Sequence, residues 1–170
     1  VHNRGKFMQE AVAPGKGAMA ALMGGTNEIT LKVCQEASAK TGQICEMANF
    51  NGGGQLVISG DKAAVEAAIQ IAEANKDLGI RRAVLLPVSA PFHCSLMQPA
   101  ADKLLPLLQR MEVANLKMPY IANVDAKAHA DGNGIVENLY RQVAKSVLWE
   151  QSMLELPKLG ITAAYELGPG

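Results

Sequence analysis

The sequence has no excess of charge of either sign, because 16 lysines and arginines balance 16 aspartates and glutamates. Proteins that bind nucleic acids concentrate positive charge, so the composition does not support a nucleic-acid partner. No hydrophobic run approaches the ~20 residues that a helix needs to cross a bilayer, and no signal peptide opens the sequence. We therefore expect no membrane partner and a cytoplasmic location.

Cysteine is also scarce. Cys34, Cys45 and Cys94 are odd in number and widely spaced. This pattern fits reduced thiols better than a disulfide framework or a zinc site, so we expect no metal. Hydrophobic residues make up 49% of the 170 residues, which is enough for a globular core and argues against disorder. The length fits one ordinary domain, or a small domain together with part of another.

Residues 17–88 have a pattern of their own. One expected helix runs from Thr26 or Asn27 to Gly42, and another begins at Asp61 and closes near Lys76; both have hydrophobic residues at helical spacing. Four segments have the length and composition of strands: 18–23, 44–50, 55–59 and 82–87. The resulting order is βαββαβ, which is that of a ferredoxin-like unit. This prediction follows from the residues alone.

The segment Asn51-Gly52-Gly53-Gly54 separates two of these strands. A phosphate-binding loop is one interpretation of the glycines. However, the segment lacks the Lys-Ser/Thr ending of such a loop, and it joins two strands instead of a strand and a helix. Because glycine accepts positive φ freely, we expect a tight hairpin turn.

After residue 89 helices and strands alternate. Helices are expected near 99–111, 135–143 and 149–157, and strands at 119–123 and 161–167. This alternation predicts a parallel α/β layer, to which we also assign residues 1–14. The fold class is therefore α/β. Residues 15–88 form a small inserted subdomain, residues 1–14 and 89–170 belong to a larger domain, and a cleft is expected between them.

Residues 89–97 read Ser-Ala-Pro-Phe-His-Cys-Ser-Leu-Met and place His93 in a proline-stiffened loop between a strand and a helix. Such junctions present catalytic side chains in α/β enzymes. Imidazole exchanges a proton near neutral pH, although a lone histidine is more often a packing or surface residue. Cys94 raises the alternative of a Cys-His nucleophile, although neighbouring residues in a loop usually point apart. Ser95 is more plausible as a helix cap than as a nucleophile.

This loop resembles the active-site histidine loop of the malonyl-CoA:acyl-carrier-protein transacylases, the bacterial enzymes of fatty-acid synthesis. The resemblance covers nearly the whole chain, and further segments follow in the order of the family: 4–10, 17–21, 49–51, 54–60, 123–125, 141–143 and 166–170. It implies an α/β-hydrolase-like parallel-sheet domain with an inserted ferredoxin-like subdomain.

The resemblance also implies the chemistry. His93 matches the general base and acid of the family, and Gln142 matches the residue whose main-chain carbonyl orients that histidine. Arg4 matches the residue that binds the malonyl carboxylate, for which the planar guanidinium fork is well suited. Phe92 resembles the bulky residue associated with unbranched malonyl units.

Three asparagines match family positions near the cleft: Asn49, Asn51 and Asn123. The first two also suit the turn chemistry of a hairpin, so a direct role stays open. The implied partners are malonyl-CoA and acyl carrier protein. No cofactor is implied, because the phosphopantetheine thiol belongs to the carrier protein.

One family feature does not occur here. The nucleophile of the family is a serine in a Gly-x-Ser-x-Gly elbow upstream of the arginine, and these 170 residues contain no such motif. We therefore expect a fragment that lacks the segment with the serine and is inactive without it. Two alternatives remain, namely an acyltransferase domain of a polyketide or fatty-acid megasynthase, and a non-catalytic module that binds acyl-CoA or carrier protein.

Overall fold

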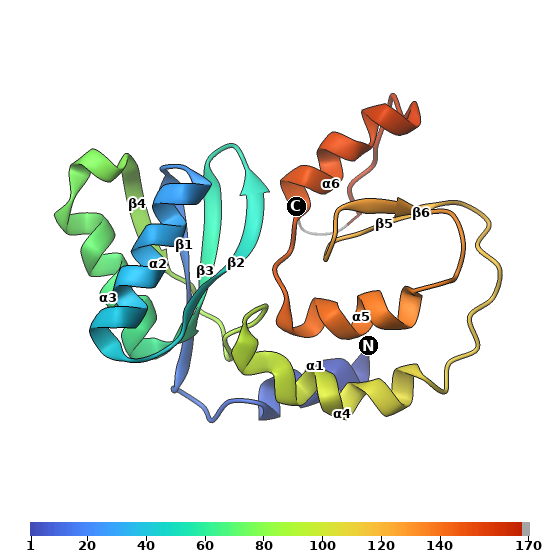
Figure 1. Cartoon of the computed structure of the whole chain (residues 1–170), viewed down its shortest axis with the longest axis horizontal. Coiled ribbons are helices and arrows are strands. Elements are labelled where there is room, and N and C mark those ends of the chain that lie inside the picture. Colours follow the sequence, from blue (N-terminus) through green and yellow to red (C-terminus); the bar gives the residue numbers. More distant parts are fainter. Residues whose placement is uncertain (168–170) are drawn as a thin grey trace.

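The computed structural model describes residues 1–167. The first part of the molecule, residues 17–85, contains a four-stranded sheet in the order β2-β3-β1-β4, in which every neighbouring pair is antiparallel (Figure 1). The strands are β1 (Gly17–Gly24), β2 (Cys45–Gly52), β3 (Gln55–Asp61) and β4 (Ile80–Leu85). Helices α2 (Asn27–Thr41) and α3 (Lys62–Ala74) cover one face, and a short helix η1 (Lys76–Leu78) precedes β4. The predicted βαββαβ order is confirmed.

Local signals set the ends of these elements. The Thr26 hydroxyl accepts a hydrogen bond from the main-chain N–H of Ile29, which caps α2, and Gly42 ends the helix in the left-handed region at φ 67°. Gly53 and Gly54 both have positive φ and form the turn between β2 and β3. The predicted hairpin is therefore present, and its turn requires glycine. β4 begins two residues earlier than predicted, because Gly79 ends η1 and Ile80 already pairs with Gly24.

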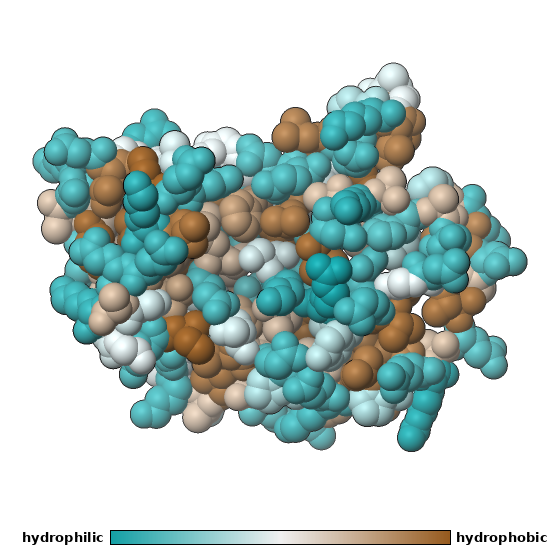
Figure 2. Space-filling model, in the orientation of Figure 1, coloured by the Kyte–Doolittle hydropathy of each residue, from teal (hydrophilic) through white to brown (hydrophobic). Residues whose placement is uncertain are grey.

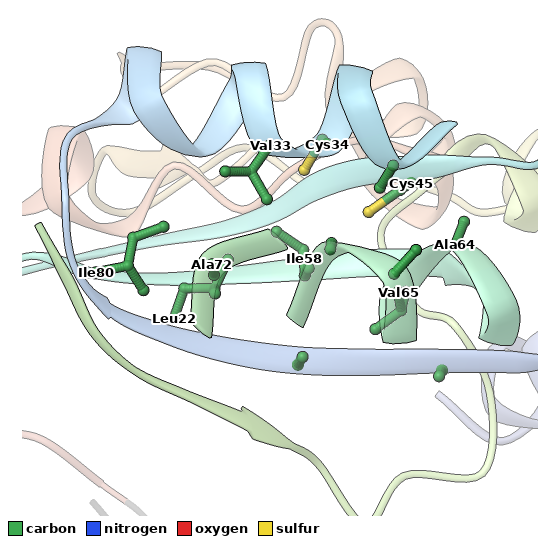
Figure 3. Close-up of a cluster of buried hydrophobic side chains, with 14 residues drawn as sticks. Leu22, Val33, Cys34, Cys45, Ile58, Ala64, Val65, Ala72 and Ile80 are labelled. Carbon is green, nitrogen blue, oxygen red and sulfur yellow. The ribbon is translucent and has the colours of Figure 1, made fainter. Parts of the chain in front are cut away.

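The sheet buries side chains on both of its faces. Alternate residues of β1 and β3 point toward α2 and α3, where Leu22, Ile58 and Val65 are completely buried (Figure 3). Met19 and Val57 belong to a smaller cluster with Ala48, against which Phe92 packs. Burial on both faces explains why residues 18–23 form an uninterrupted hydrophobic run. The second face is the one that meets the loop of His93.

Leu22→Ala should destabilise the protein by about 2–5 kcal/mol, because it removes a fully buried side chain and leaves a cavity in the core. Leu31→Ala is the matched control, since Leu31 is 48% exposed on α2, and we expect a change within about 0.5 kcal/mol. Urea unfolding measures both free energies. Equal effects of the two substitutions would contradict the assigned core.

The second part of the molecule is mainly helical. Helix α4 (Gln98–Leu108) packs against α1 (His2–Glu10) and α5 (Ile135–Ala144), and a buried cluster with Met8, Met97, Leu104 and Val143 joins them. The remaining elements are η2 (Ser95–Met97), β5 (Tyr120–Ala122), β6 (Lys127–His129), α6 (Trp149–Glu155) and η3 (Pro157–Leu159). Helix α1 thus packs against helices from the C-terminal half of the chain.

Two predictions for this part were wrong in detail, and the predicted parallel layer does not form within residues 1–167, where β5 and β6 pair with each other in an antiparallel hairpin of three residues a side. Residues 161–167 are not a strand, since no strand in the described part of the chain pairs with them; residues 168–170 lie outside that part. The helix expected near 99–111 ends at Leu108 as α4, and Met111 lies beyond it and is 43% exposed.

The two parts of the molecule are joined along β2. The main-chain N–H and C=O groups of Val147 bond to Ala48 O at 2.8 Å and to Phe50 N at 2.9 Å. The next residue, Leu148, donates to Asn123 O at 2.8 Å. The segment after α5 therefore pairs with the edge strand β2 over a short stretch.

Figure 2 shows hydrophilic side chains spread over most of one face of the molecule, with hydrophobic ones interspersed among them. No helix within residues 1–167 is long and apolar enough to cross a membrane.

Candidate active site

The loop between β4 and η2 presents His93 to the end of α5. The ring nitrogen Nδ1 of His93 lies 3.0 Å from the main-chain oxygen of Gln142. A carbonyl oxygen only accepts hydrogen bonds, so Nδ1 carries the proton and donates it. In the neutral ring Nε2 is then unprotonated and free to act as a base. The expected pairing of His93 with the Gln142 carbonyl is present in the structure.

The end of α5 explains why this carbonyl is available. Gln142 lies in the last turn of the helix, where carbonyl groups have no partner within the helix. The Gln142 side chain donates to the main-chain oxygens of Lys145 (3.1 Å) and Ser146 (3.3 Å), which fixes the turn. The carboxyl end of a helix also favours positive charge. The position therefore suits a histidine that becomes cationic during a reaction.

Burial is the main influence on the pKa of His93. It lowers that pKa below the ordinary value, and the nearby positive charge of Arg4 lowers it further. The main-chain carbonyl groups of Gln142 and Lys145 act on the pKa in the opposite direction. Because the net shift of the pKa is downward, the imidazole is neutral at pH 7 and ready to accept a proton.

Arg4 lies on α1, half-buried, and burial lowers the pKa of its guanidinium. Its positive charge contributes to the lowered pKa of His93. Among residues 1–167 it forms no ion pair with a carboxylate, whereas Lys6 and Lys103 both approach Glu10. α1 is held in place by its packing on α4 and by Gln9, which accepts a 2.6 Å hydrogen bond from Ser89. A fixed cation without a carboxylate partner is suited to an anionic ligand.

The other predicted site residues lie around the join between the two parts. Phe92 is half-buried and packs against both the α1/α4/α5 cluster and the cluster of Met19 and Val57. Asn49 forms an isolated parallel bridge with Val147, and Asn51 lies two residues further along β2. No side-chain hydrogen bond of either asparagine is among the described contacts of residues 1–167.

Asn123 and Gln142 share an apolar cavity of about 340 Å³ between β5 and α5. Neither His93 nor Arg4 lines this cavity. Asn49 and Asn123 thus contact the segment that follows Gln142, but no described contact joins either of them to the imidazole of His93.

Cys94 does not suit the role of a nucleophile. Its side chain is completely buried and donates to the main-chain oxygen of Pro91 at 3.1 Å. Burial raises the pKa of the thiol to about 11. The reactive thiolate is therefore nearly absent at neutral pH, which argues against the Cys-His alternative.

Cys94 should accordingly resist alkylation in the folded protein. With a pKa of about 11, about one thiol in a thousand is ionised at pH 8, and the side chain is closed to solvent. Mass spectrometry after iodoacetamide treatment should find Cys94 unmodified in the native protein and modified in urea. Rapid modification of the native protein would restore the nucleophile hypothesis.

Glu46 on β2 lies near the site and was not predicted from the sequence. Its carboxylate accepts hydrogen bonds from both the hydroxyl and the main-chain N–H of Ser95, which was expected to cap its helix. The two residues are 49 positions apart, and no sequence signal indicates this contact. In residues 1–167 no group of three His, Cys, Asp or Glu side chains is placed to hold a metal ion.

Comparison with known proteins gives the family. No protein-family model matches the sequence. Malonyl CoA-acyl carrier protein transacylase of Escherichia coli K12 is 45% identical over 170 residues, which is 100% of this chain and 53% of the relative. The Bacillus subtilis 168 protein of the same name is 41% identical over 170 residues, or 52% of its length. The chain belongs to the malonyl-CoA:acyl-carrier-protein transacylase family.

Solved transacylase structures have the same fold. The enzyme from Xanthomonas oryzae superposes with a TM-score of 0.91 at 39% identity and covers 100% of this chain and 52% of its own. A malonyl-transacylase solved in complex with a type II polyketide-synthase acyl-carrier protein has a TM-score of 0.89 at 42% identity, covering 98% of this chain and 52% of its own. The chain thus spans about half the length of the transacylases it matches.

Proposed function

We propose that the whole protein transfers malonyl from malonyl-CoA to the phosphopantetheine thiol of acyl carrier protein. The observation that carries the proposal is the 3.0 Å hydrogen bond from His93 Nδ1 to Gln142 O, which leaves Nε2 free as a base. The positive charge of Arg4, which has no carboxylate partner within residues 1–167, lowers the pKa of the same imidazole. The relatives named above support the choice of reaction, because those proteins are transacylases of this type.

Two acyl transfers make up the proposed cycle. His93 Nε2 takes the proton of a serine hydroxyl, and the serine oxygen attacks the thioester carbonyl of malonyl-CoA. The thioester C–S bond breaks, and the imidazolium returns the proton to the departing CoA sulfur. The carrier-protein thiol then attacks the malonyl-serine ester with His93 in the same role. The serine is not one of these 170 residues, which contain no Gly-x-Ser-x-Gly motif.

We assign substrate selection to Arg4 and Phe92. The guanidinium of Arg4 would pair with the free malonyl carboxylate, and Phe92 would favour a malonyl group without a branch. Asn49, Asn51 and Asn123 are proposed to line the cleft. The reaction needs no cofactor, because the acyl group moves between thiol and hydroxyl oxygen without redox change.

The finer organisation is proposed as follows. Residues 15–88 form a ferredoxin-like subdomain, supported by the βαββαβ order and the antiparallel sheet. Residues 1–14 and 89–170 form part of an α/β-hydrolase-like domain whose parallel sheet involves other segments of the whole protein. We propose a cytoplasmic location, where such transacylases meet their soluble substrates.

A transfer assay tests the function. The whole protein, malonyl-CoA and phosphopantetheinylated carrier protein should give malonyl-carrier protein, detected by mass spectrometry. A module that only binds would retain affinity for malonyl-CoA or carrier protein without turnover, and the lack of a serine elbow favours that behaviour for the 170 residues assayed alone. The length of the parent protein distinguishes a stand-alone enzyme from a domain of a megasynthase.

The pH dependence should report His93. Because burial and Arg4 lower the pKa of the imidazole, the base stays unprotonated down to a pH below the ordinary histidine value of about 6.5. We therefore expect kcat/KM for malonyl-CoA to be constant near pH 7 and to fall only in more acidic solution. An acid limb above pH 7 would contradict the neutral state assigned to His93.

A further inference from the structure

A second contact holds the loop of His93. Glu46 accepts two hydrogen bonds from Ser95, which lies two positions after the histidine: Oε2 receives the main-chain N–H at 2.8 Å, and Oε1 receives the hydroxyl at 2.7 Å. Both oxygens of one carboxylate thus bind one residue. Such a two-point contact fixes the orientation of the loop as well as its position.

The same stretch of β2 also holds the end of α5. Met47 O accepts a 2.7 Å hydrogen bond from the hydroxyl of Ser146, and Ala48 O accepts the N–H of Val147 at 2.8 Å. Ser146 is in turn one of the two acceptors of the Gln142 side chain. Three consecutive residues of β2, from Glu46 to Ala48, therefore bind the two segments that carry the His93–Gln142 hydrogen bond. Glu46 binds Ser95 in the loop of His93, and Met47 and Ala48 bind the residues that follow α5.

The backbone of His93 needs such support. Its φ is 60°, in the left-handed region that residues other than glycine rarely adopt. A conformation of this kind persists only where the surroundings determine it. The imidazole contact with Gln142 is one constraint on this loop, and the Glu46–Ser95 contact, two residues after His93, is another.

We propose that Glu46 is a positioning residue for the transfer reaction. It holds the loop so that Nδ1 of His93 donates to the Gln142 carbonyl and Nε2 stays free. The kinetic part of this inference rests on the proposed transacylase function, whereas the structural part rests on the contacts alone. Glu46 touches neither substrate nor the reacting atoms in this role and acts through the loop.

Substitutions at both partners test the contact in the whole protein. Glu46→Ala should lower kcat by about 10-fold with little change in the KM for malonyl-CoA, since a small displacement of a catalytic group is costly. Ser95→Ala should have a smaller effect because the main-chain bond remains, and Ser95→Thr, which keeps a hydroxyl, should be close to wild type. The double variant should match Glu46→Ala, because the two residues share one contact.

Glu36→Ala is the control for the loss of a carboxylate. Glu36 is exposed on α2, and no ion pair or side-chain hydrogen bond of it occurs in the described part of the chain. This variant should keep the wild-type kcat. If Glu46→Ala also keeps the wild-type kcat, or loses activity only in proportion to unfolded protein in circular dichroism, the proposal is wrong.

Nitrogen NMR of the histidine rings gives a readout without turnover. In wild type His93 should show the Nδ1-protonated form, and in Glu46→Ala a mixture of tautomers whose pKa rises toward the ordinary histidine value as burial weakens. An unchanged His93 signal in Glu46→Ala would overturn the proposal whatever the activity. If wild type transfers no malonyl, the proposed function fails, while the NMR comparison still decides the role of Glu46.

Discussion

Replacing His93 with alanine in the whole protein should slow malonyl transfer by at least ~10²-fold, the usual contribution of a general base. The physical reason is the loss of Nε2, which the hydrogen bond from Nδ1 to Gln142 O leaves free to take the serine proton. Folding should change little, because the ring is only partly buried and the loop keeps its other contacts. The rate of malonyl-enzyme formation in single-turnover experiments measures the effect directly.

His2→Ala is the matched control for this experiment. His2 is exposed on α1, and we expect transfer at the wild-type rate. His93→Gln adds a second test, since glutamine fills a similar volume but cannot act as a base, and it should be as slow as the alanine variant. Malonyl-enzyme that accumulates at the wild-type rate in either His93 variant would remove His93 from the mechanism.

Arg4→Ala should lower kcat/KM for malonyl-CoA strongly and that for acetyl-CoA little. A half-buried guanidinium that pairs with the malonyl carboxylate contributes about 1.5–3 kcal/mol per charge-assisted hydrogen bond, or roughly 10-fold to 150-fold. Acetyl offers no carboxylate, so with that substrate the cation keeps its desolvation cost, which its lowered pKa reflects, and gains no partner. The ratio of kcat/KM for malonyl-CoA to kcat/KM for acetyl-CoA should therefore be smaller in Arg4→Ala than in the wild type.

Arg4→Lys separates charge from geometry. An ammonium keeps the positive charge but lacks the planar fork, so this variant should recover only part of the malonyl activity. Lys6→Ala is the control, because Lys6 lies on the same helix with its side chain 60% exposed. The measurement is kcat/KM for malonyl-CoA and acetyl-CoA in all four proteins. An equal loss for both substrates in Arg4→Ala would assign Arg4 to structure or to CoA binding instead.

The sequence alone predicted the order of elements in the small unit and proposed His93, Gln142 and Arg4 as site residues, of which the structure shows His93 and Gln142 in contact. Thr26, Gly42 and the glycines before Gln55 act over a few neighbouring residues, so helix ends and the hairpin could be predicted from local chemistry. The resemblance of residues 89–97 and of the segment around Arg4 to the transacylases indicated the family, and the comparisons confirm it.

Contacts between distant segments were decided only by the tertiary structure. Residues 161–167 have the composition of a strand, yet a strand forms only where another strand offers a row of hydrogen bonds, and no strand within residues 1–167 pairs with this segment. The pairing of Glu46 with Ser95 left no trace in the sequence, because a glutamate on an edge strand and a serine at a helix start are both ordinary surface residues. Folding brings them together by placing β2 beside the loop of His93, and that placement depends on the packing of both parts of the molecule.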